Sequence, residues 1–65
     1  MNYYIVYDGR AVYDEDAAAV LDSIGEASRD DALAEFKREW SDADAVLFEY
    51  DVDGEEIING RRVFT

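Results

Sequence analysis

The sequence predicts a small α+β domain in which an antiparallel sheet packs on one main helix, in the element order ββαββ. A helix with a start signal occupies residues 28–40, runs rich in aromatic and β-branched residues flank it, and Asp-Gly and Asn-Gly pairs separate those runs. A chain of 65 residues fits a single domain, so we treat residues 1–65 as one unit. A domain of this size buries only about 60% of the surface that its unfolded chain exposes, so its core is small.

The helix is predicted by both its ends and its apolar spacing. Ser28 can cap its first turn, with Asp31 three residues later where a capping-box acid belongs. Acidic residues come early and Lys37 and Arg38 come late, which suits the helix dipole.

Apolar residues three and four positions apart give this helix one buried side. Leu33, Phe36 and Trp40 form a stripe, which we interpret as core and not as an anchor for a ligand. The side chains expected to face water are those of Arg29, Glu35 and Glu39.

The first strand is predicted over Tyr3–Tyr7, where the sequence YYIVY is aromatic and β-branched. Both of its faces are apolar, although a single helix can cover only one face of a small sheet. The other face is therefore covered by another segment or serves as an interface, since tyrosine is common at interfaces. The residues assigned to a possible dimer face are Tyr3, Tyr4 and Tyr7.

The stretch 17–25 is compatible with a strand or a helix. Ala17, Val20, Leu21 and Ile24 have helical spacing, which would give a second helix over 15–24 and the order ββααββ. The very short gap before Ser28 favours a strand, because two helices need room to reverse direction. We prefer a strand that pairs with the first one.

A hairpin is predicted in the last third of the chain. A strand over Ala45–Val52 would bury its even-numbered apolar residues and turn Glu49 and Asp51 to solvent. Asp53-Gly54 is a two-residue hairpin signal, and the adjacent apolar residues at 57 and 58 predict a bulge near Asn59. Arg61 and Arg62 are expected to pair across the strands with Glu55 and Glu56.

Composition argues against an enzyme and against a cofactor. The chain contains no cysteine and no histidine, so it lacks a thiolate nucleophile, the commonest general base and the commonest metal ligand. Residues 49–55 imitate the first half of a calcium-binding EF-hand loop, but the later ligand positions fail. We interpret the acidic run 14–16 as a solvated loop and expect no metal site.

The net charge of −11 is the strongest compositional signal. A chain this acidic is repelled by nucleic-acid backbones and anionic membranes, so we expect neither direct nucleic-acid binding nor membrane binding. No signal peptide and no apolar run of about 18 residues is present, so a cytoplasmic location is expected. The partner that suits this charge is a basic protein surface.

The first functional hypothesis is an acidic protein-binding module that competes for a basic, possibly nucleic-acid-binding, groove. In size, charge and element order the chain is similar in type to small phage or mobile-element proteins that block host defence nucleases, including some anti-CRISPR proteins, although it carries no family motif. The residues assigned to partner binding are Asp30, Asp31, Glu35, Glu39, Asp42, Asp44, Glu49, Asp51, Asp53, Glu55 and Glu56.

In the alternative hypothesis, the acidic surface residues serve solvation and do not bind a charged partner. Abundant acids with a single lysine also suit a salt-adapted protein or a GC-rich genome. The chain would then be a small structural or homodimeric domain that acts through its tyrosine-rich strand. Self-association would also help a domain with a marginal core.

Overall fold

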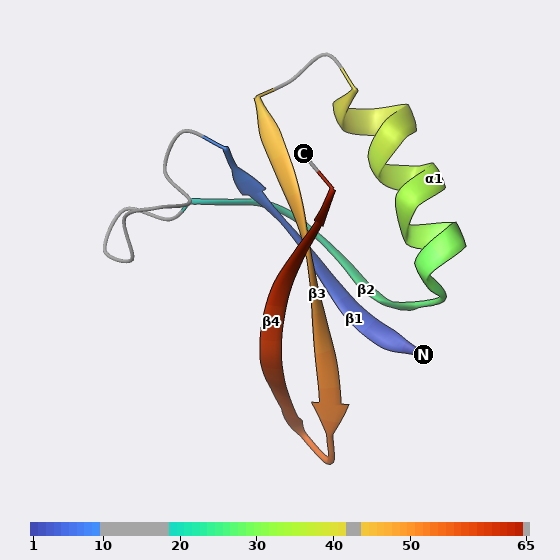
Figure 1. The fold of residues 1–65 in the computed structure, drawn as a ribbon, viewed down its shortest axis with the longest axis vertical. Coiled ribbons are helices and arrows are strands. Elements are labelled where there is room, and N and C mark those ends of the chain that lie inside the picture. Colours follow the sequence, from blue (N-terminus) through green and yellow to red (C-terminus); the bar gives the residue numbers. More distant parts are fainter. Residues whose placement is uncertain (10–18, 42–43, 65) are drawn as a thin grey trace.

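The computed structural model describes residues 1–9, 19–41 and 44–64, and it contains a four-stranded antiparallel sheet with one helix (Figure 1). This confirms the predicted α+β class and is consistent with the order ββαββ. The elements are β1 (Asn2–Asp8), β2 (Val20–Ala27), α1 (Arg29–Trp40), β3 (Ala45–Asp53) and β4 (Glu56–Phe64).

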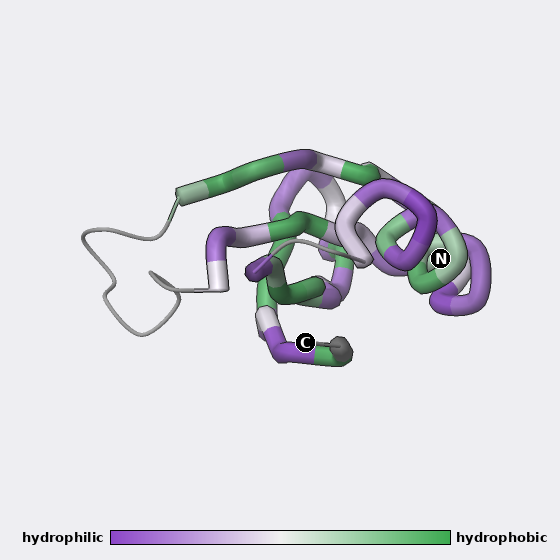
Figure 2. Tube along the Cα trace, turned by 90° about the horizontal axis from the view of Figure 1, so that it is seen from above, coloured by the Kyte–Doolittle hydropathy of each residue, from purple (hydrophilic) through white to green (hydrophobic). Residues whose placement is uncertain are grey.

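The strands lie in the order β2-β1-β3-β4. Strand β1 is antiparallel to both of its neighbours, so β2 and β3 run in the same direction and α1 forms the crossover between them. Seen from above, α1 lies on one side of the sheet (Figure 2). Every other described element is a strand of the sheet itself, so α1 covers one face only.

Residues 20–27 form a strand, which confirms the preferred interpretation for this part of the stretch and rules out the alternative of a helix for residues 20–24. Residues 15–18 lie outside the described residues. As predicted, β2 pairs with β1, but the register shifts twice, so that Leu21 and Ile24 are extra residues on β2. These bulges explain the helix-like spacing, because each extra residue interrupts the two-residue alternation of a regular strand.

Helix α1 begins as the sequence predicts. The Ser28 Oγ accepts a hydrogen bond from the Asp31 N–H at 3.2 Å. Ala32 and Phe36 are buried, and Leu33 and Trp40 pack partly buried beside them, which confirms the predicted apolar stripe.

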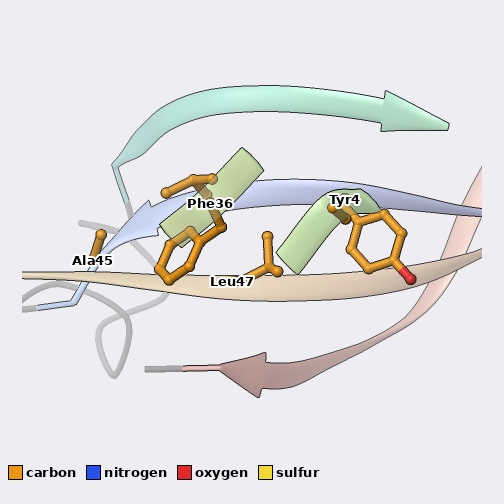
Figure 3. Close-up of a cluster of buried hydrophobic side chains, with 6 residues drawn as sticks. Tyr4, Phe36, Ala45 and Leu47 are labelled. Atoms are coloured by element: carbon orange, nitrogen blue, oxygen red, sulfur yellow. The ribbon is translucent and has the colours of Figure 1, made fainter. Parts of the chain in front are cut away.

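The core lies between α1 and the centre of the sheet (Figure 3). The helix contributes Ala32 and Phe36 to this core. They pack against two residues of β1 and two of β3, namely Tyr4, Val6, Ala45 and Leu47. The register explains this choice of face, since Leu47 lies opposite Val6. The prediction that β3 buries its even-numbered side and turns Glu49 to solvent is therefore wrong, because α1 covers the odd-numbered side and, on the even-numbered side, only Val46 is buried.

The predicted bulge near Asn59 is present. Glu49 pairs with Arg61 but Asp51 pairs with Ile58, so β4 carries one extra residue between these pairs. Asn59 has φ 56°, in the left-handed region that asparagine tolerates better than most residues, and its Nδ2 donates to Asp51 Oδ2 at 3.1 Å. The ring of Tyr50 occupies the space that a side chain at position 60 would need.

The packing of Tyr50 against Gly60 predicts a steric cost for any side chain there. A Cβ at position 60 would overlap the Tyr50 ring, so Gly60→Ala should lower the free energy of unfolding by about 1–3 kcal/mol. The control is Gly54→Asn, since position 54 has φ 63° with open space around it and asparagine tolerates that conformation. Urea unfolding measures both variants, and equal losses would contradict the packing argument.

Candidate functional site

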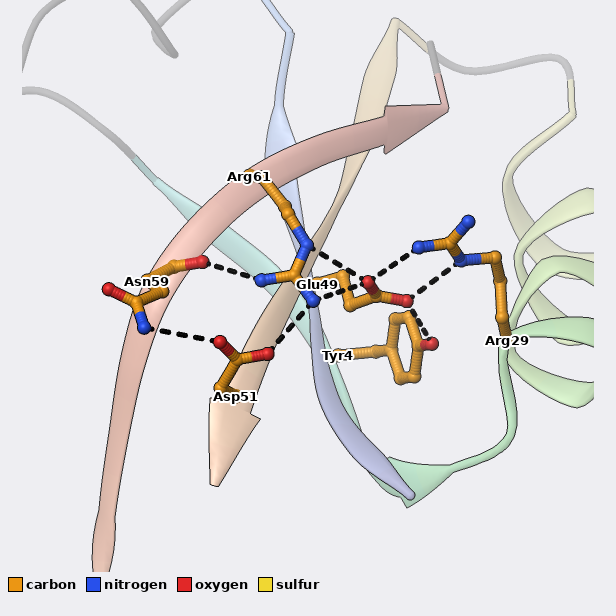
Figure 4. A network of polar contacts seen from close by, with 6 residues as sticks. All are labelled: Tyr4, Arg29, Glu49, Asp51, Asn59 and Arg61. Carbon is orange, nitrogen blue, oxygen red and sulfur yellow. Dashed lines mark hydrogen bonds and ion pairs between the residues drawn. The ribbon is translucent and has the colours of Figure 1, made fainter. Parts of the chain in front are cut away.

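Glu49 is the buried charged residue around which the polar groups of the described chain converge. It is 1% exposed. The Tyr4 hydroxyl donates to one carboxylate oxygen, and Arg29 donates to both oxygens at 2.9 and 2.7 Å. Arg61 donates through Nη2 at 2.6 Å and through Nε at 3.0 Å (Figure 4).

Four different elements supply these groups. Tyr4 of β1 and Arg61 of β4 lie opposite Glu49 of β3 in the strand register, one on each side. Arg29 is the first residue of α1, so the start of the helix places its guanidinium over the sheet. The cluster therefore ties the helix to three strands at one point.

The surrounding groups hold Glu49 in its charged form. Hydrogen bonding by Arg29 lowers the pKa of Glu49 to about 2, helped by Tyr4 and Arg61 and opposed by burial. Burial raises the pKa of Tyr4, and the neighbouring carboxylate raises it further. A carboxylate with such a low pKa is a poor proton acceptor near neutral pH, so this arrangement suits structure better than acid–base catalysis.

Asp51 extends the cluster towards the surface. Arg61 Nη2 donates to Asp51 Oδ1 at 2.9 Å, and this contact together with Asn59 lowers the pKa of Asp51. The two acids, Glu49 and Asp51, are balanced by Arg29 and Arg61. The cluster is thus close to neutral, and it uses two of the six basic residues in the sequence.

Two sequence predictions about these residues are wrong, because Glu49 does not face solvent and Arg61 pairs with Glu49 and Asp51 instead of with the acids at the turn. Arg29 is exposed as predicted, and its guanidinium also binds Glu49. The common cause is that α1 covers the face on which Glu49 stands. The one signal in the sequence is that Glu49 lies two and four residues after the apolar residues Leu47 and Ala45, so all three point to the same face of β3.

Most of the remaining acids assigned to partner binding form two groups, and Asp44 lies apart from both, between α1 and β3. One group lies on α1, and the other lies at the turn between β3 and β4, which Figure 1 shows at the end of the hairpin away from α1. The exposed members are Asp30, Asp31, Glu39, Asp44, Asp53, Glu55 and Glu56, while Glu35 and Asp51 are partly exposed. Asp42 lies outside the described residues.

The hairpin turn concentrates like charges. Asp53 lies directly opposite Glu56 in the register, and Glu55 occupies the turn between them. Like charges in opposite positions of a strand pair are destabilising. Residues 49–55, which imitate half of an EF-hand loop, form the end of β3 and the hairpin turn. Their first acid, Glu49, is buried against Arg29 and Arg61.

A shallow groove of about 370 Å³ runs between α1 and β2. Its apolar lining comes from Ile24, Ala27 and Ala34, and its polar lining comes from Asp31, Glu35 and Arg38. The groove therefore combines an apolar floor with acidic groups contributed by the helix.

The possible dimer-face tyrosines are divided between the two faces of the sheet. Tyr4 is 1% exposed on the helix side, so its assignment to a dimer face is wrong. Tyr3 and Tyr7 lie on the opposite face and are partly exposed. There the Tyr7 ring meets Phe48 edge-on at 5.2 Å, and the hydroxyls of Tyr7 and Tyr50 lie 2.5 Å apart.

No match is found when the chain is compared with protein-family models, with curated proteins or with solved structures. Within residues 1–9, 19–41 and 44–64, no group of three or more acidic side chains is arranged to hold a metal ion. In the same part of the chain, no helix is long and apolar enough to cross a membrane.

The cluster around Glu49 predicts a pH-dependent stability. The pKa of Glu49 falls from an ordinary 4.5 to about 2 on folding, so its contribution is complete above about pH 5 and is lost as the pH falls towards 2. Glu49→Gln should lower the free energy of unfolding by about 3 kcal/mol at pH 7, because it leaves Arg29 and Arg61 without their buried carboxylate partner. The variant should also lose less stability than the wild type between pH 5 and pH 2.

Urea unfolding at pH 7, 5, 4 and 3 measures both effects. Glu39→Gln is the control, since Glu39 is exposed on α1 and its removal should change stability by less than about 0.5 kcal/mol. Parallel pH profiles for Glu49→Gln and the wild type would rule out Glu49 as the source of the acid sensitivity.

Proposed function

We propose that the protein is a small acidic binding module that holds a basic protein surface against α1. The observation that carries this proposal is the stripe of Asp31, Glu35 and Glu39 on the helix, beside the groove that α1 forms with β2. These acids are four residues apart, so they project from the same side of the helix.

The spacing of the stripe suits a partner with regularly placed cations. Four residues of α-helix rise about 6 Å, so the three carboxylates present a row of charges with that repeat. One strand of duplex DNA carries a charge about every 3.4 Å along the helix axis. The stripe therefore offers roughly half of the linear charge density of a DNA strand on a rigid support, which supports competition for part of a nucleic-acid-binding groove.

The groove beside the stripe suits a lysine or arginine side chain. Long basic side chains lay their methylene groups on apolar surface and keep the charged end in a polar setting. Ile24, Ala27 and Ala34 supply the apolar surface, and Asp31 and Glu35 supply the acidic end. Binding of this kind rests on both shape and charge.

Among the described basic side chains, Arg38 lies against this acidic surface and also lines the groove. Arg29 and Arg61 are directed at Glu49 on the other side of the helix–sheet junction. Arg38 reaches Glu35 at 3.7 Å and Glu39 at 3.3 Å, but these are exposed ion pairs of the kind worth about 0.2–1 kcal/mol. A partner's lysine can displace such a pair at little cost.

Binding to a fluorescent ten-residue lysine-rich peptide tests the proposal. Fluorescence anisotropy at 50, 150 and 300 mM NaCl should show affinity that falls at least tenfold over this range, because screening weakens exposed charge contacts. A labelled DNA duplex should not bind at any of these salt concentrations, because its backbone is repelled.

Two charge-matched triple variants locate the site. Asp31→Asn with Glu35→Gln and Glu39→Gln should weaken peptide binding about tenfold or more at 150 mM NaCl. Asp53→Asn with Glu55→Gln and Glu56→Gln removes the same charge from the hairpin turn and should weaken it less than threefold. Equal losses in the two variants would mean that the peptide follows net charge alone, and the helix site would be rejected.

A further inference from the structure

The sheet face opposite α1 carries a partly exposed aromatic and aliphatic surface, here called the open face. Its centre consists of alternate residues on β1 and β3, namely Tyr3, Ile5, Tyr7, Val46, Phe48 and Tyr50. Five of these six are partly exposed, and only Val46 is buried. The face continues to both edges with exposed aliphatic side chains, since Val20 on β2 is 59% exposed and Ile57 on β4 is 41% exposed.

The side chains at the centre of this face already hold one another in place. Tyr7 contacts Phe48 edge-on, Tyr7 and Tyr50 share a hydrogen bond between their hydroxyls, and Tyr50 lies over Gly60. Aromatic side chains that are already ordered lose little conformational freedom when a partner covers them. Binding at the open face should therefore cost little side-chain conformational entropy.

Charge is nearly absent from the open face, although the sequence contains 17 acids. Among the paired positions of the described strands, the register places two charged residues there. Glu26 lies opposite Tyr3 at the β2 edge, and Arg62 lies opposite Phe48 at the β4 edge. A surface that is depleted of charge and enriched in tyrosine and phenylalanine has the composition of an interface core.

We propose that the open face binds the same face of a second copy of the chain, around a two-fold axis parallel to the strands. Such an axis places β2 of one copy over β4 of the other. It therefore brings Glu26 of each copy near Arg62 of its partner, because the two residues are offset by only two positions along the strands. An axis across the strands would instead place β2 over β2 and bring like charges together.

The charge distribution selects a second copy over a basic partner as the occupant. Among the described strand residues, the face offers a basic partner one acid, Glu26. A second copy finds an acid at the β2 edge and a base at the β4 edge, and it carries the opposite charge for each of them. The acids of α1 stand on the other side of the sheet, so in the dimer they point outward and away from the contact. Arg62 already interacts within its own chain, and its guanidinium has five N–H donors, so it can bind Glu26 of the partner copy as well.

This inference stands apart from the proposed function, since it concerns the opposite side of the sheet. A dimer would carry the acidic stripe of α1 twice, on its two outer surfaces. It would also cover apolar area that a domain of this size cannot bury by itself, and so would add concentration-dependent stability.

Sedimentation equilibrium at 5–200 μM chain in 150 mM NaCl tests the dimer. The expected result is a monomer–dimer equilibrium that reaches twice the chain mass at the upper concentrations. A single species with the mass of the monomer at 200 μM would overturn the proposal, as would assembly that continues beyond the dimer.

Charge exchange tests the direction of the axis. Glu26→Arg alone and Arg62→Glu alone should each weaken dimerisation about threefold to tenfold. The double variant should return the dissociation constant to within twofold of the wild type. Glu26 and Arg62 of one chain lie on opposite edges of the sheet, so rescue must come from contact between copies. Failure of the double variant to recover would overturn this arrangement.

A second pair of variants tests the face independently of those charges. Val20→Lys and Ile58→Lys make the same change in charge at exposed aliphatic side chains, and Ile58 is 37% exposed. Val20 lies on the open face opposite Tyr7, whereas Ile58 lies opposite Asp51 on the helix side. Val20→Lys should weaken the dimer at least tenfold and Ile58→Lys less than twofold, with circular dichroism confirming that both fold. The reverse order would place the interface on the other face.

Discussion

The carboxylate of Glu49 accepts hydrogen bonds from three elements around it, and the placement of the helix depends on this contact. An isolated carboxylate taken out of water is costly, and here Arg29, Arg61 and the Tyr4 hydroxyl offset that cost. Because Arg29 is the first residue of α1, the same contact fixes where the helix starts over the sheet. This polar anchor joins α1 to β1, β3 and β4 beside a small apolar core.

The anchor also shapes the charge of the surface. It directs Arg29 and Arg61 at Glu49, while the acids of α1 meet Arg38 in exposed ion pairs. The result is a domain with two unlike sides, since α1 carries acids and the opposite sheet face carries aromatic rings with few charges. The two proposed contacts use the aromatic side and the groove beside the helix, because each combines apolar area with a few charged side chains.

Local signals in the sequence account for the parts of the fold that were predicted correctly. Ser28 and the apolar stripe ending at Trp40 define α1, because capping and helical spacing depend on neighbours within a few residues. Asp53-Gly54 and Asn59 define the hairpin turn and its bulge for the same reason, through the conformations that these residues tolerate. The strand at residues 20–27 was harder to predict, because its two bulges disturb the alternation that identifies a strand.

Composition and local pattern were sufficient to predict the α+β class, the element order, the helix ends, the acidic character and the apolar nature of both faces of β1. Long-range packing sets which face of the sheet α1 covers, and it therefore also sets the burial of Tyr4 and Glu49 and the partners of Arg29 and Arg61. The alternation along β3 is the same whichever side the helix takes. The choice depends on the register between distant strands and on the crossover of α1 from β2 to β3, and these are contacts between residues far apart in the chain.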